Sequence, residues 1–206
     1  MTDNLPAFDE LSNIRTTISE EMTAMYEKER HINRKRFEDM IFELITMGYV
    51  YGIEVAGLDL EADIPVNAER MKDVAWKPTA GENFGKRIRN HFDEYNRSPQ
   101  DEAARAKLAE QLSVIAETET HRSINTGAQD GADEYAEEHP TATLFKRWVT
   151  MGDDRVRDTH DFLEGAIVPK DARFYSYDGD SARFPGDFVR PENNINCRCI
   201  IRSVKQ

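Results

Sequence analysis

Residues 98–140 read SPQDEAARAKLAEQLSVIAETETHRSINTGAQDGADEYAEEHP, and this stretch decides the fold. It opens on the strongest helix start signal in the chain. Ser98 can cap a helix, Pro99 suits the first helical position, and the acidic residues that follow complement the positive end of a helix. Apolar residues then recur every three or four positions, and Pro140 cannot continue the helix. The pattern predicts one long helix over residues 98–138.

The chain before this helix is also helical in pattern. Apolar residues at three- and four-residue steps predict one helix along Leu11–Met25 and a second from Phe37 to near Gly57. Residues 58–80 have no steady apolar period and contain two prolines, which indicates an irregular connection. A further helix is expected from Asn83 to Tyr95.

After Pro140 the pattern changes to short apolar and aromatic runs separated by glycine and proline. The runs are Leu144–Val149, Ala166–Val168, Phe174–Tyr177 and Ile200–Val204. One short helix is expected at about residues 155–163. These features are typical of a small module of mixed helix and strand, so the predicted fold class is α+β. We expect a helical attachment region over residues 1–97 and a second region over 98–206, made of the long helix and an α+β part at 141–206.

The distribution of charge and of apolar residues bears on whether the protein contacts DNA or a membrane. The 206 residues carry a net charge of −12, and residues 1–140 hold 16 Lys and Arg against 29 Asp and Glu. Residues 141–206 are nearly balanced, with 11 against 10. A general electrostatic grip on duplex DNA needs clustered basic residues, so any DNA contact is expected through the C-terminal part. No secretory signal is visible, and the apolar run at residues 40–50 is too short and too polar to span a bilayer. We therefore expect folding in a cytoplasm and no membrane partner.

Several small features follow one another in the second half of the chain. Polar residues line the predicted helix from Glu117 to Gly127, where apolar packing is expected. Trp148 then precedes the segment Asp153–His160, and the chain closes on Glu192–Cys199.

In this order and spacing, the features resemble the phage head-morphogenesis, or Mu F-like, family of minor head proteins. The resemblance covers roughly residues 105–202. The residues that carry it are Trp148, Asp154, Arg155, Val156, Arg157, His160, Leu163, Gly165, Phe174, Pro185, Gly186, Asn196, Cys197, Arg198 and Cys199. It implies a virion component present in few copies near the portal, and it supplies no catalytic mechanism.

Cys197 and Cys199 lie two positions apart, so in extended chain both thiols project to one side. With His160 they form a three-ligand set for zinc, with Asp154 or Asp158 as a fourth ligand. The alternative is a small packed core in which the thiols act as compact apolar groups. We favour the packed core and expect no cofactor, with zinc as the open alternative. Under either interpretation His160 should contact Cys197 or Cys199.

The charged residues around His160 also allow two interpretations. They form a catalytic cluster if His160 acts as a general base. Alternatively, Arg–carboxylate pairs pin the segment to the helix around Glu117–Arg122. We favour the ion pairs, and we expect Trp148 in the core.

The resemblance therefore implies a non-enzymatic bacteriophage minor head protein, acting in head assembly near the portal and in DNA packaging or delivery. The expected partners are the portal protein or the major capsid protein, and the expected location is the virion, after assembly in the host cytoplasm. The alternative is a metal-dependent hydrolase or toxin-like effector that uses His160, Cys197 and Cys199.

Overall fold

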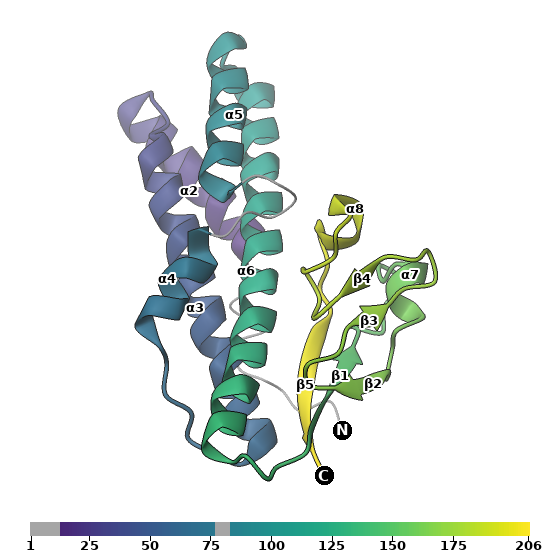
Figure 1. The fold of residues 1–206 in the computed structure, drawn as a ribbon. Coiled ribbons are helices and arrows are strands. Elements are labelled where there is room, and N and C mark those ends of the chain that lie inside the picture. Colours follow the sequence, from purple (N-terminus) through teal and green to yellow (C-terminus); the bar gives the residue numbers. More distant parts are fainter. Residues whose placement is uncertain (1–12, 77–82) are drawn as a thin grey trace.

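A computed structural model describes residues 13–76 and 83–206 and has an α+β fold, as predicted. A tall group of helices stands beside a small C-terminal module (residues 141–206), which lies along one side of the longest helix (Figure 1). The helices are α2 (Ile14–Glu29), α3 (Arg34–Leu60), α4 (Ala68–Trp76), α5 (Phe84–Arg97) and α6 (Glu102–Glu138).

The module contains two antiparallel sheets. The larger has the order β2-β1-β5, with β1 (Leu144–Val149) in the centre between β2 (Ile167–Pro169) and β5 (Ile200–Lys205). The smaller pairs β3 (Phe174–Tyr175) with β4 (Ser181–Ala182). Two one-turn helices complete the module, α7 (Asp158–Asp161) and α8 (Pro191–Asn194).

Most of the predicted elements are confirmed. The two N-terminal helices are separate: α2 ends where Arg30 adopts a left-handed conformation, and Asn33 caps α3 by accepting from the backbone N–H groups of Lys35 and Arg36. Asn83 caps α5 in the same way, and β1 matches the predicted run at both ends. Leu11 and Pro78 lie outside the described residues.

Three predictions need correction. The helix predicted from Ser98 starts at Glu102, because the Ser98 hydroxyl bonds to Tyr95 O at the end of α5 and Asp101 caps α6 instead. The region predicted to be irregular holds the end of α3 and all of α4, whose start Asn67 caps through the N–H groups of Glu69 and Arg70. The short helix predicted over residues 155–163 shrinks to the four residues of α7.

Helices α3 and α6 cross at unusually short range, and glycines make this possible. A Cβ added at Gly127 would lie 2.1 Å from Tyr49 O, and one at Gly52 would lie 2.0 Å from Ile124 O. Glycine lets two backbones approach where any side chain would separate them. One core then extends from α2 through α3 and α5 to α6, so residues before and after position 98 share it.

Helix α3 is long and apolar enough to cross a membrane by length and composition alone. Its buried residues, Phe37, Ile41 and Ile45 among them, belong to the core that α6 completes. The prediction that this region is too short and too polar to span a bilayer was based on residues 40–50 alone. The apolar composition continues to Leu60. A core helix can have the same composition as a membrane span, and 44% of the most apolar window of α3 is buried inside the structure.

Candidate functional site

Helix α6 presents buried polar side chains to the module, and these explain the polar run that the sequence places on a packed helix. We call Thr118, Asn125 and Gln129 the polar strip of α6. The Thr118 hydroxyl accepts from Asn196 N at 3.2 Å, and Gln129 Oε1 accepts from Lys146 Nζ at 3.0 Å. Burial lowers the pKa of Lys146 to about 8.

Asn125 is the most connected member of the strip. Its Nδ2 donates to Cys199 O at 3.0 Å, and its Oδ1 accepts from Ile201 N at 2.8 Å. The side-chain amide thereby pairs with the chain entering β5 as a neighbouring strand would. Asn125 is fully buried, so these bonds have no competition from solvent. The strip fixes where Cys197 and Cys199 lie relative to α6.

The opposite wall of the site is the segment before and within α7. Asp153 caps the turn by accepting from Arg155 N at 3.2 Å, and it forms a bidentate ion pair with Arg198 at 2.6 and 2.8 Å. Arg157 donates to Ile195 O. These contacts hold the α7 segment against the chain that carries the two cysteines.

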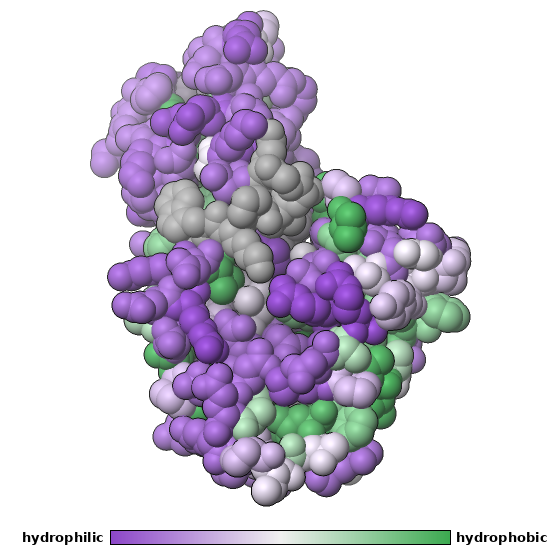
Figure 2. All heavy atoms as spheres, in the orientation of Figure 1, coloured by the Kyte–Doolittle hydropathy of each residue, from purple (hydrophilic) through white to green (hydrophobic). Residues whose placement is uncertain are grey.

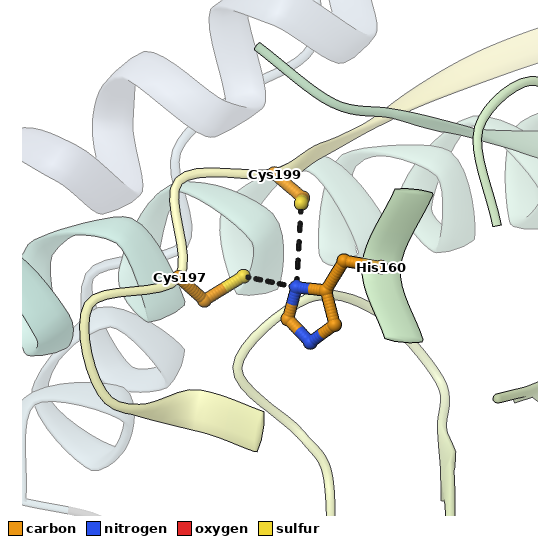
Figure 3. Close-up of side chains that lie close together, drawn as sticks. All are labelled: His160, Cys197 and Cys199. Carbon is orange, nitrogen blue, oxygen red and sulfur yellow. Dashed lines mark hydrogen bonds between the residues drawn. The ribbon is translucent and has the colours of Figure 1, made fainter. Parts of the chain in front are cut away.

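The structure brings His160, Cys197 and Cys199 together from these two segments (Figure 3). His160 Nδ1 lies 3.5 Å from the Sγ atom of each cysteine, and all three side chains are buried. The expected contact between His160 and the cysteine pair is therefore confirmed. Both cysteines are free thiols.

Aromatic rings enclose the other side of the histidine. His160 stacks on Phe188 at 5.3 Å between ring centroids and meets the edge of Trp148 at 5.7 Å. Trp148 is fully buried, as expected for a core residue, and it also contacts Phe174. Within the described residues, His160 Nε2 has no hydrogen-bond partner, so Nδ1 is the ring nitrogen that meets polar groups.

The two thiols influence each other. A hydrogen bond with Cys199 lowers the pKa of Cys197, despite burial, and the same contact with burial raises the pKa of Cys199. The pair therefore gives up its first proton more readily than its second. Arg157 and Arg198 also favour the ionised form of Cys197.

Other residues of the motif shape the backbone around His160 and the two cysteines. Gly165 and Gly186 adopt positive φ angles of 72° and 93°, which favour glycine. Gly165 N donates to Trp148 O, and Gly186 packs against Arg122 of α6 beside the buried Pro185. Asn196 takes a positive φ of 57° immediately before Cys197.

Two expectations about charged residues are not met. Asp154 and Asp158 are exposed and do not belong to the group of ligand atoms around His160, so neither completes a zinc site. The Arg–carboxylate pairs also have other partners than predicted, because Glu119 on α6 pairs with Arg87 and Arg122, whereas Arg198 pairs with Asp153.

Sequence reasoning missed the residues that position the site, above all Asn125. It registered polar side chains at residues 117–127 but could not assign their partners, which lie more than 70 positions away. An amide on a helix stretch that is expected to pack is the signal that could have singled out Asn125, because buried polar groups are hydrogen-bonded.

Comparison with known proteins gives a family and two relatives. The model of a family described as "Phage Mu protein F like protein" matches residues 77–202. The minor head protein GP7 of Bacillus phage SPP1 is 31% identical over 88 residues, which are 43% of this chain and 28% of that protein.

The second relative is the NAD(+)–arginine ADP-ribosyltransferase EFV of Enterococcus faecalis. It is 26% identical over 153 residues, which are 65% of this chain and 31% of that protein. The chain thus spans about three tenths of the length of each relative. No solved structure was found to match the chain.

Proposed function

Because this chain belongs to the phage Mu protein F-like family, we propose that it is a minor head protein that acts in assembly of the phage head. The observation that carries the proposal is the family match over residues 77–202, which takes in α5, α6 and almost all of the module. The similarity to the SPP1 minor head protein is in line with it.

Within this role we propose that the protein lies near the portal, with the portal or major capsid protein as its partner. We also propose that any contact with DNA during packaging or delivery involves the module, because residues 141–206 are nearly balanced in charge whereas the preceding part is strongly acidic.

We assign the protein no catalytic step. The relative described as an ADP-ribosyltransferase is about three times as long as the region it shares with this chain, and that region is only 26% identical. Family membership likewise favours the assembly role over a metal-dependent hydrolase or toxin-like effector built on His160 and the cysteines.

Mass spectrometry of purified procapsids and DNA-filled virions tests the assembly role. We expect the protein in both kinds of particle, at a copy number well below that of the major capsid protein. Absence from both particles, in cells where the protein is expressed, would refute the proposal.

Two surfaces compete for attachment to the partner. We propose the acidic helical region, in which Glu20 and Glu27 are exposed on α2. The module, however, carries most of the exposed large apolar side chains among the described residues, whereas Figure 2 shows that the upper helices are mostly hydrophilic. These module side chains are Met151, Phe162, Ile167, Tyr175, Tyr177, Val189 and Ile195.

Matched charge reversals distinguish the two surfaces. Replacing Glu20 and Glu27 by Lys should lower incorporation into particles, whereas the same change at the exposed Asp161 and Glu192 of the module should not. The opposite result would place attachment on the module. Point substitutions are preferable to deleting residues 1–57, because that deletion removes most of α3 and its core.

A further inference from the structure

We propose that His160, Cys197 and Cys199 bind one zinc ion, which fastens the start of β5 to α7. The three ligand atoms lie within 4.8 Å of one another, although His160 is 37 and 39 positions from the two cysteines. All three side chains are buried, so their meeting is part of the folded core.

The spacing of the ligand atoms fits zinc. Zinc–sulfur bonds of about 2.3 Å and zinc–nitrogen bonds of about 2.0–2.1 Å, at tetrahedral angles, separate nitrogen from sulfur by about 3.5 Å. His160 Nδ1 lies 3.5 Å from Cys197 Sγ and 3.5 Å from Cys199 Sγ. Both nitrogen–sulfur edges of the expected tetrahedron are therefore present.

Hydrogen bonding alone accounts for this arrangement less well. Nδ1 of an imidazole offers either one proton or one lone pair, so it can make one good hydrogen bond in the plane of the ring. Here it faces two sulfur atoms at equal distance (Figure 3). A cation between the three atoms satisfies both sulfurs and the nitrogen together.

The charges also balance. Binding releases the two thiol protons, and the divalent ion with two thiolates and a neutral imidazole has no net charge. A neutral centre is tolerated in a buried position where an isolated ion is not. The guanidinium groups of Arg157 and Arg198 border the site, so positive charge lies beside the two sulfur atoms.

A small hollow beside the cysteines provides the fourth coordination position. It is lined by His160, Cys197 and Cys199 with Met151, Arg155 and Arg157 among its other walls, and it has room for about one water molecule. Since Asp154 and Asp158 lie outside the ligand group, we assign this position to water.

Cobalt titration of the purified, reduced full-length chain tests the proposal, because thiolate-bound Co²⁺ absorbs visible and near-ultraviolet light. We expect saturation at one ion per chain and displacement by Zn²⁺. His160→Gln, Cys197→Ser and Cys199→Ser should each weaken Co²⁺ binding by more than the roughly 10–100-fold that loss of an outer-sphere partner costs. His31→Gln, which alters an exposed histidine, should bind as the wild type does.

Two results would overturn the assignment. One is folded wild-type protein that shows no thiolate–cobalt absorption in excess Co²⁺. The other is a cysteine variant that binds with wild-type affinity. The wild-type titration decides the first point by itself, so a variant that fails to fold leaves the test intact.

Discussion

Removing the side chain of Asn125 should destabilise the protein by several times as much as removing a buried hydroxyl that bonds only within α6. Asn125→Ala leaves Cys199 O and Ile201 N without their partner in a fully buried place. Each unpaired buried group costs about 1–3 kcal/mol. Alanine recovers about 0.5 kcal/mol through its higher helix propensity. The expected net loss in the free energy of unfolding is therefore about 2–5 kcal/mol.

Ser113→Ala is the matched control, since Ser113 is buried on the same helix. Its hydroxyl donates to Ala109 O within α6, and that carbonyl keeps its helical hydrogen bond when the hydroxyl is removed. We expect a loss of about 1 kcal/mol or less for this change. Urea unfolding followed by circular dichroism measures both variants.

One result of these two unfolding measurements would contradict the prediction for Asn125. Asn125→Ala within about 1 kcal/mol of Ser113→Ala would mean that water or a shifted β5 satisfies the two backbone groups. The polar strip would then not position the cysteine segment, and our account of the site's geometry would be wrong.

Two further predictions concern α6. Burial, with a smaller contribution from Arg198, lowers the pKa of His121 to about 4, so the unfolded chain binds this proton first. The contribution of His121 to stability should fall by about 3 kcal/mol as the pH drops from about 6.5 to 4, and His121→Gln should remove that part of the slope in urea unfolding across this range. An unchanged slope would contradict the assignment. Gly127→Ala should cost about 3 kcal/mol or more, because its Cβ would meet Tyr49 O, and should lower the melting temperature more than Gly131→Ala, which meets the Ala56 methyl group. Equal losses would show that the helices can separate freely.

The sequence predicted helices and strands correctly where their ends are set by residues close by in the chain. Pro140 predicted the end of α6 correctly, and the short apolar and aromatic run at Leu144–Val149 predicted β1. The start of α6 was wrong because Ser98 closes α5, and the chain then turns at Gln100 with a φ of 55° before Asp101 can cap. A capping residue serves the helix before it or after it, and the sequence alone does not say which.

The candidate site also contains one contact that the sequence predicted and others that it could not predict. The meeting of His160 with the cysteines was predictable because short polar and thiol residues are worth placing in a small domain only if they contact each other. The roles of Asn125 and Thr118 were not, because each bonds to backbone atoms. Every residue has those atoms, so the sequence of the partner segment carries no mark of the contact.

The polar strip has a consequence for the proposed role in the phage head. Apolar burial has no preferred direction, so apolar contacts alone specify the position of the module along α6 less sharply than hydrogen bonds do. The bonds from Asn125 to the chain entering β5, and the pairing of Asp59 on α3 with Arg202 on β5, fix one position. A partner that binds the helices therefore also sets the orientation of the module.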